Sequence, residues 1–363
     1  MVSERHAGEE GREAAAQPTR RSILLRIALL VAIVTFVFVV LLPRVVDYDA
    51  VRAALAGLTP GQLAALIAAT TVAYILNAGP ARLLVPGLTS RRAVAADLVG
   101  RAVASTIPGP SDVAIKSVLF GQWKIPLDAA NAGLVLASLF EPLSSLVLPL
   151  IATIGVIVTG QTASLRVLLL TVVGMAVLTL VALILVAIVR SEALARKVGE
   201  RLDRWARRLW SWFRRTPPTG IVDGVLRFRI SSVDILSNRG LLGFGAAVAA
   251  KLGWFVVLEL CLAAVGVDWA TLPPAATLTA MAVVGIVALV PITPGAVGVS
   301  EVAYIGLLST VAGQGAGEAI TAAVLLFRVA QWLAPIPIGW LLLAAIRGRK
   351  WAASLRKDQP GLG

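Results

Sequence analysis

The chain has 363 residues, of which 58% are hydrophobic and 15% charged, and its mean hydropathy is +0.87. Soluble domains carry about 25% charged residues, so this composition excludes an ordinary soluble globular protein. A formal net charge of +13 would suit nucleic-acid binding in a soluble protein. Here the basic residues lie between apolar segments, as the positive-inside bias of membrane proteins requires, so no nucleic-acid partner is expected.

Two residue counts limit the chemistry further. Cys261 and His6 are the single cysteine and the single histidine of the sequence. These counts exclude an internal disulfide, a Cys/His zinc site and a catalytic centre built on histidine. The sequence also lacks a phosphate-binding nucleotide loop. We therefore expect no metal, no cofactor, no catalytic residue and no enzymatic activity.

The apolar residues are grouped in blocks of roughly 20 or more, the length that crosses about 30 Å of hydrocarbon. A polar, disordered cytoplasmic tail is predicted over 1–21, a transmembrane domain over 22–346, and a second cytoplasmic tail over 347–363. In chain order, the expected apolar segments are 23–42, 62–80, 129–158, 164–189, 240–265 and 318–346.

A basic linker is predicted over 190–239, with 12 Lys/Arg and 5 Asp/Glu residues. Its apolar residues recur at the spacing of one helix face: Leu194, Val198, Leu202, Trp205, Leu209 and Trp212. This pattern predicts a helix in the membrane interface, with anionic lipid head groups as its partner. An ordinary basic linker is the alternative. Either interpretation places this segment, and with it both termini, in the cytoplasm of a plasma (inner) membrane protein.

Two further apolar stretches, 93–122 and 275–313, are broken in the middle. A proline stops a helix, and irregular backbone at bilayer depth needs cover from protein or water. We therefore predict two re-entrant hairpins that enter from opposite sides, as in an inverted repeat with a binding site at the midplane. Two short full spans at each break are the alternative. The residues assigned to the breaks are Pro108, Gly109, Pro294, Gly295 and Gly298.

The predicted fold class is thus an all-α polytopic membrane bundle, with about six full spans, two re-entrant hairpins and the pattern of an inverted repeat. Nine ionisable residues fall within or beside its apolar segments: Asp97, Arg101, Asp112, Lys116, Glu141, Lys251, Glu259, Glu301 and Arg328. Each costs about 2.5–3.5 kcal/mol at mid-bilayer unless it is paired or hydrated. The group predicts a polar cavity, with ion pairs that only hold helices together as the alternative.

Six of these residues are predicted to bind substrate: Arg101, Asp112, Lys116, Glu141, Glu301 and Arg328. Glu301 and Arg328 are expected to form an ion pair or to face each other across the cavity. Arg101, Lys116 and Arg328 suit a phosphate group through charge-assisted hydrogen bonds. Exposed N–H groups at half-helix starts near Gly109 and Gly295 would also favour an anion.

The segment from Val290 to Glu301, followed by Arg328, resembles the P-x-x-P-G-G-x-G-x-x-E … R pattern of the lysylphosphatidylglycerol synthase transmembrane family, which is flippase-like. More loosely, 77–82 and 108–116 resemble the family's N-A-x-R and P-x-x-x-G-[DE] segments. The chain departs from the family at Ala296, at Ser111-Asp112 and at Glu141-Pro142. The similarity covers about 22–346 and leaves out the soluble aminoacyltransferase domain of the lipid-modifying members.

The resemblance implies a flippase or transporter that moves a phosphate-bearing lipid between leaflets. The candidate lipids are an aminoacylated phospholipid and a polyprenyl-phosphate-linked sugar. A membrane-embedded lipid-linked glycosyl- or phosphotransferase is the alternative from another class, although acidic residues in the predicted external loops are few: Asp47, Asp49 and Asp268. A scaffold that recruits partners through 190–239 is a third reading.

Overall fold

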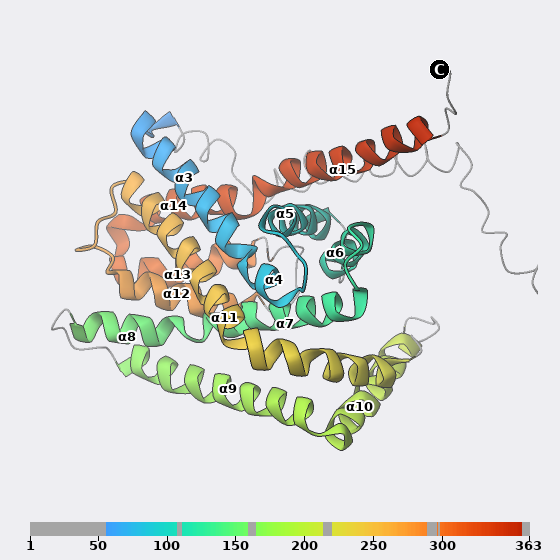
Figure 1. Ribbon diagram of the computed structural model, residues 1–363. Helices are drawn as coiled ribbons and strands as arrows, with labels where there is room; N and C mark the ends of the chain where they lie inside the picture. Colours follow the sequence, from blue (N-terminus) through green and yellow to red (C-terminus); the bar gives the residue numbers. More distant parts are fainter. Residues whose placement is uncertain are drawn as a thin grey trace, which may run out of the picture. The chain divides into compact units, whose positions relative to one another are not determined.

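The computed structural model describes residues 56–106, 111–158, 165–212, 220–288, 296 and 298–357. The chain divides into two compact units, Met1–Asp47 and Tyr48–Gly363, and all described residues belong to the second. The described chain consists of helices joined by turns and contains no β-strand, which confirms the predicted all-α fold class (Figure 1). Several sequence predictions lie outside the described residues: the tail 1–21, the first span 23–42, and Pro108, Gly109, Pro294 and Gly295.

Five stretches of the described chain are long and apolar enough to cross a membrane. They are Pro60–Leu84, Leu127–Val158, Thr171–Arg190, Ile235–Ala264 and Gly317–Arg347. Each coincides with one of the predicted apolar segments, so a polytopic helical membrane protein is confirmed.

The first two of these stretches are each built from two helices. The first contains α3 (Pro60–Asn77) and α4 (Gly79–Leu84), and the second contains α7 (Leu127–Ser145) and α8 (Leu148–Val158). The start of α3 is fixed by a capping box, in which Thr59 Oγ1 accepts from the Gln62 N–H and Gln62 Oε1 accepts from the Thr59 N–H. Within α7, Pro142 interrupts the backbone hydrogen bonding one residue after Glu141.

The remaining spans involve two long helices, a third helix that connects them without being a span, and one segment with a π-helical turn. Helix α9 covers Leu165–Arg190, α10 covers Glu192–Trp212 and α11 covers Ile221–Ala264. The last span runs through α14 (Gly317–Arg328), the π-helical turn η5 (Val329–Leu333) and α15 (Pro335–Lys357), after a short 3₁₀ turn at Gln314–Ala316.

Two predicted boundaries differ from these helices. The linker predicted over 190–239 is not one unit: α10 occupies its first half, and its last part is continuous with the transmembrane helix α11. Helix α15 also continues to Lys357, into the predicted tail 347–363. Both differences arise because a helix continues past the bilayer edge wherever its backbone hydrogen bonding is not interrupted, and hydropathy does not report that.

The two broken apolar stretches form pairs of short helices in contact. Helices α5 (Ser90–Thr106) and α6 (Ser111–Gln122) pack together, as do α12 (Pro274–Val287) and α13 (Val299–Ala312). The 12 residues of α6 rise by about 18 Å and the 14 residues of α13 by about 21 Å. Because hydrocarbon is about 30 Å thick, each of these two helices is shorter than a full span, and the choice between re-entrant hairpins and short full spans stays a prediction.

A helix from each half of the chain packs against the pair of short helices in the other half. Helix α8, from the first half, packs against α12, and α15, from the second half, packs against α5 (Figure 1). Helices α3 and α11, which precede the two hairpins, pack along each other. This reciprocal packing brings polar residues of both hairpins toward one central region.

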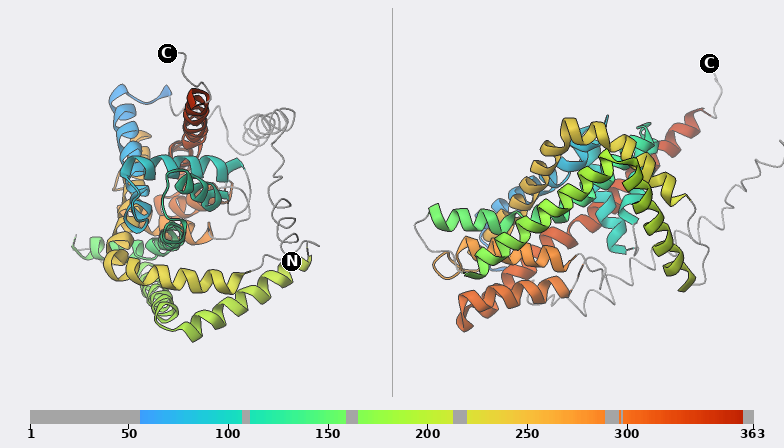
Figure 2. Two further views of the ribbon diagram at one scale, coloured as in Figure 1. Left: turned by 45° about the vertical axis from the view of Figure 1, so that its right-hand side comes forward. Right: turned by 90° about the horizontal axis from the view of Figure 1, so that it is seen from below.

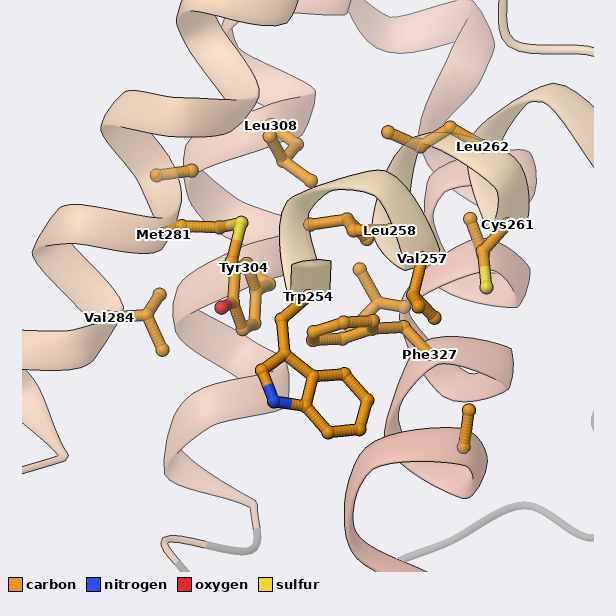
Figure 3. Close-up of a cluster of buried hydrophobic side chains, with 14 of the residues drawn as sticks. Trp254, Val257, Leu258, Cys261, Leu262, Met281, Val284, Tyr304, Leu308 and Phe327 are labelled. Carbon is orange, nitrogen blue, oxygen red and sulfur yellow. The ribbon is translucent and has the colours of Figure 1, made fainter. Parts of the chain in front are cut away.

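A hydrophobic cluster beside this region holds α11, α12, α13 and α14 together (Figure 3). The Trp254 ring packs edge-on against Tyr74 and Phe327, with ring centroids 5.1 and 6.2 Å apart. Phe327 also contacts Tyr304, at 5.7 Å between centroids. These rings bury large apolar areas and fix the helices that carry the neighbouring charged residues.

Candidate substrate cavity

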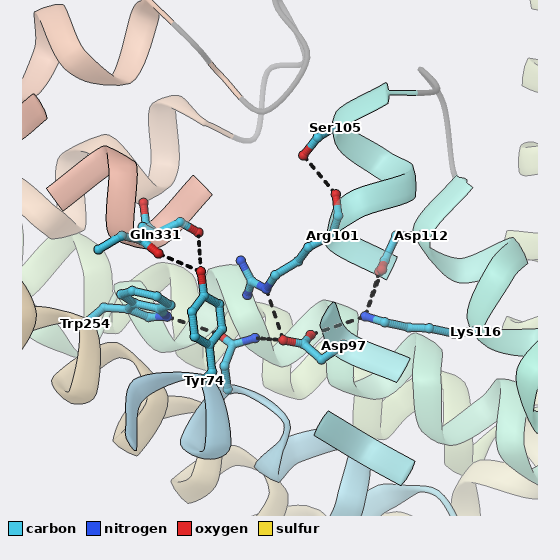
Figure 4. A network of polar contacts seen from close by, with 10 residues as sticks. Tyr74, Asp97, Arg101, Ser105, Asp112, Lys116, Trp254 and Gln331 are labelled. Atoms are coloured by element: carbon cyan, nitrogen blue, oxygen red, sulfur yellow. Dashed lines mark hydrogen bonds and ion pairs between the residues drawn. The ribbon is translucent and has the colours of Figure 1, made fainter. Parts of the chain in front are cut away.

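Asp97 is the centre of the first polar network (Figure 4). Its carboxylate accepts hydrogen bonds at 3.0 Å from Arg101 Nε and at 3.0 Å from Asn77 Nδ2, and Lys116 Nζ lies 3.5 Å away. Lys116 Nζ is also 2.9 Å from the Asp112 carboxylate. The network therefore joins α3, α5 and α6, with each of the two carboxylates matched by a cation.

Gly100 allows the two arms of the first hairpin to approach closely enough for this network. A Cβ at position 100 would overlap the Asp112 carboxylate and would lie 2.6 Å from Lys116 Cε. Lys116 itself is buried, with 9% of its surface exposed. The close contact between α5 and α6 at this glycine thus buries Lys116 between the two helices.

Glu301 and Arg328 form the second polar contact, and the predicted ion pair is confirmed. Arg328 Nε lies 2.6 Å from Glu301 Oε1, and both residues are buried. The other carboxylate oxygen accepts the backbone N–H of Gly298 at 2.7 Å. Gly298 adopts φ +83°, a conformation that favours glycine, at the start of α13. Glu301 is therefore held by the helix start and in turn orients Arg328.

Arg328 is positioned by two residues of the π-helical turn as well. Its Nη1 donates to Gln331 Oε1 at 3.1 Å, and its guanidinium lies 6.0 Å from the Trp332 ring centroid. The turn is held from α3, because the Tyr74 hydroxyl donates to the Ala330 carbonyl at 2.6 Å. A π-helical turn frees backbone carbonyls, and Tyr74 satisfies one of them.

A cavity of about 490 Å³ lies between the two networks. Its walls come from both halves of the chain, and Ala296 and Ser300 place the start of α13 beside it. The charged residues on its walls are Arg101, Glu141, Lys251 and Arg328. A smaller void of about 50 Å³ adjoins it and shares the walls formed by Asn77, Ser138, Glu141 and Lys251.

The structure thus divides the six predicted substrate-binding residues into three groups. Arg101, Glu141 and Arg328 line the large cavity, whereas Asp112 and Lys116 line only the smaller void. Glu301 lies behind Arg328 and lines neither. Of the structural breaks, Gly298 is described and begins α13.

The sequence analysis counts Lys251 among the nine charges that predict a polar cavity, but not among the six residues predicted to bind substrate. Within the described chain, neither Lys251 nor Glu141 has an ion-pair or side-chain hydrogen-bond partner. Glu259, the acidic residue of that segment, instead accepts the Trp269 indole N–H at 2.8 Å and lines neither cavity. Lys251 and Glu141 are therefore the two charges of the cavity wall that form no salt bridge within the described chain.

No group of His, Cys, Asp and Glu among the described residues has the arrangement of a metal site. What the cavity offers is three cations, one carboxylate and several neutral donors, such as Asn77 and Gln331. Arginine presents planar N–H pairs that match a phosphate or carboxylate, and both Asp97 and Glu301 contact their arginines through Nε.

Helical spans, two short hairpins and a charged cavity between them define a polytopic membrane protein with an internal polar site. Residues 23–339 match the family described as Lysylphosphatidylglycerol synthase TM region, and the chain belongs to this family. It is also 35% identical over 167 residues to a UPF0104 membrane protein of Methanothermobacter thermautotrophicus. That match covers 42% of this chain and 44% of the relative's length. No solved structure matches the chain.

Proposed function

We propose that this protein moves a phosphate-bearing lipid between the two leaflets of the plasma (inner) membrane. The observation that carries the proposal is the cavity lined by Arg101, Lys251, Arg328 and Glu141, within spans that are otherwise apolar. Membership of the lysylphosphatidylglycerol synthase transmembrane family, a group with a lipid in its description, supports it.

The physical reason is the cost of moving a charged head group through hydrocarbon. An ionised group at the bilayer centre costs at least about 2.5–3.5 kcal/mol, and a phosphate carries its charge on strongly hydrated oxygens. A cavity with fixed cations replaces that hydration, while the acyl or prenyl chains remain in the surrounding lipid. The cavity volume of about 490 Å³ falls in the range of small-molecule sites.

In this proposal Arg101 and Arg328 contact the phosphate, and Asp97 and Glu301 position the two guanidinium groups. Lys251 adds a third cation, and Glu141 contacts a hydroxyl or amine of the head group. No bond of the lipid is made or broken. Aminoacylated phospholipids and polyprenyl-phosphate-linked sugars both satisfy these requirements.

The proposal is tested by reconstituting the full chain in liposomes with lipids labelled on the head group. Transport predicts leaflet exchange with no new lipid species, whereas a glycosyl- or phosphotransferase predicts a new species in extracts of the same liposomes. Exchange no faster than in protein-free liposomes, for all phosphate-bearing lipids, would reject transport.

The Glu301–Arg328 pair gives the matching test of the site. Glu301→Gln and Arg328→Ala should each abolish exchange. The first leaves the Arg328 guanidinium without the carboxylate that orients it, and the second removes that guanidinium. Membrane insertion should remain normal, as measured by the amount of protein in the membrane fraction. Wild-type exchange by both variants would remove this pair from the site.

A further inference from the structure

Helix α10 has an apolar face that is only partly covered. Successive residues are rotated by about 100° around a helix, which places Ala195, Gly199 and Ala206 on one edge of this face. This small-residue edge packs on α11: Ala195 is fully buried, and a Cβ at Gly199 would lie 3.0 Å from the Val222 Cα. The two helices therefore lie side by side over the first turns of α11 (Figure 2).

The other edge of the same face carries the large side chains and is uncovered in the described chain. Leu202 is 50% exposed and Trp205 is 76% exposed. Beside them, on the side away from α11, lie three exposed cations, Lys197, Arg201 and Arg208. A tryptophan next to a row of long basic side chains is the arrangement that favours the head-group layer of a bilayer.

The place of α10 in the chain brings this edge to the membrane surface. The preceding span, Thr171–Arg190, ends one residue before Ser191, whose Oγ accepts the Leu194 N–H at 3.2 Å and so caps the start of α10. The chain thus changes direction at the end of the span (Figure 1). Because α10 begins there and packs along α11, docking on the membrane surface would not require the ordering of a free helix.

The charges on α10 favour an anionic surface on this side in particular. Glu192 pairs with Arg196 at 3.7 Å, and Asp203 pairs with Arg207 at 2.6 Å. Both pairs lie on the polar side of the helix away from Trp205, so Glu192 and Asp203 are engaged with cations of that side.

We propose that the lipid-facing edge of α10, formed by Leu202, Trp205, Lys197, Arg201 and Arg208, docks on the anionic lipid head groups of the membrane that holds the protein. Trp205 and Leu202 enter the boundary between head groups and acyl chains, and the three cations contact lipid phosphates. This surface is separate from the cavity, so the inference does not depend on lipid transport.

The experiment uses the full chain with Cys261→Ala and a spin label at Trp205→Cys, reconstituted in nanodiscs with or without anionic lipid. Accessibility to oxygen and to a water-soluble nickel complex reports the depth of the label. We expect head-group depth in anionic nanodiscs and a shift toward water in neutral nanodiscs or at high salt. A label at Glu200→Cys, on the opposite side of α10, should remain in water throughout.

A matched pair of double variants separates docking from general charge. Lys197→Gln and Arg201→Gln together should lower the ratio of docked to undocked label about 25-fold, since each cation near an anionic surface contributes about fivefold. The same two charges removed from the opposite side, by Arg196→Gln and Arg207→Gln, should change the ratio far less.

Two results would overturn the inference. One is a label at position 205 that remains in water in anionic nanodiscs. The other is a label shielded from both relaxing agents and indifferent to lipid charge, which would identify a protein segment as the partner of this edge.

Discussion

Lys251 and Glu141 stand apart from the other charges of the cavity because neither forms a salt bridge with any described residue. Asp97 holds Arg101 and Lys116, and Glu301 holds Arg328, so these ion pairs fulfil a structural role as well as presenting cations. An ionised side chain without a partner reduces stability at bilayer depth unless water or a ligand surrounds it. If a charged residue serves to bind the ligand, removal of its charge should therefore slow lipid exchange but should not lower the stability of the protein.

Lys251→Gln should slow lipid exchange at least about tenfold, the effect of losing roughly 1.4 kcal/mol of ligand contact. The thermal unfolding midpoint in detergent should stay the same or rise, because the cost of burying the Lys251 charge exceeds its attraction to Glu141. Lys124→Gln makes the same change at an exposed loop position and should alter neither quantity. Unchanged exchange by Lys251→Gln would show that the lysine does not contact the lipid.

Gly100 is the second residue with a specific expectation. Gly100→Ala should separate α5 from α6, because its Cβ would meet Asp112 and Lys116. We expect a loss of about 1–3 kcal/mol in stability, read as a lower unfolding midpoint, together with slower exchange. Gly245→Ala in α11 meets no atom within 4 Å and should be neutral or slightly stabilising. Equal midpoints for the two variants would contradict the close packing.

At the scale of elements, the cavity depends on helices that are interrupted where they pass it. Glu141 precedes Pro142 inside α7, and Arg328 precedes the π-helical turn η5. An interruption changes the direction of side chains and exposes backbone carbonyls, and it is tolerated only where other groups satisfy them. Both interruptions lie at the cavity wall, one in each half of the chain.

Tyr74→Phe tests the support of the π-helical turn. Losing the hydroxyl leaves the Ala330 carbonyl without this donor, so the unfolding midpoint should fall by roughly 2–8 °C, for a loss of about 1–3 kcal/mol. Exchange should also slow, because Arg328 and Gln331 adjoin the same turn. Tyr304→Phe is the control for stability, since the Tyr304 hydroxyl has no hydrogen-bond partner within the described chain. A smaller fall in the unfolding midpoint for Tyr74→Phe than for Tyr304→Phe would show that the Tyr74 hydroxyl does not support the π-helical turn.

At the scale of the whole molecule, the reciprocal packing of α8 on α12 and of α15 on α5 links the two halves. Each half contains a span, a pair of short helices and a further interrupted span, in the same order along the chain. From this order we expect an inverted repeat, in which one hairpin opens to each side of the membrane.

Cysteine labelling distinguishes re-entrant hairpins from full spans. In a Cys261→Ala background, Arg91→Cys and Lys124→Cys flank the first pair of short helices, and Trp269→Cys and Gly315→Cys flank the second. A membrane-impermeant maleimide should reach the first two only from the cytoplasm and the last two only from outside. Two short full spans would give these flanking positions the same sidedness, so the break of each pair decides. Ser111→Cys should be labelled from outside, and Val299→Cys from the cytoplasm, only if the short helices cross the membrane fully.

The sequence alone determined the membrane class, five of the described spans, the breaks that separate the short helices, and the Glu301–Arg328 pair. These features follow from local quantities: the length of an apolar run sets a span, and a motif of small residues before Glu301 sets a helix start. The length of α11 and the continuation of α15 were not predictable, because an uninterrupted helix extends into water without a change in pattern.

Only the tertiary structure decided which charges share a cavity. It joined Lys116 to Asp97 and Asp112 inside the first hairpin, placed Glu301 behind Arg328, and brought Lys251 of α11 opposite α7, which carries Glu141. In the sequence all of them look alike, as single charges in apolar surroundings. Whether such a charge is paired or left for a ligand depends on the helix that packs beside it, and that is set by the packing of segments distant in the chain.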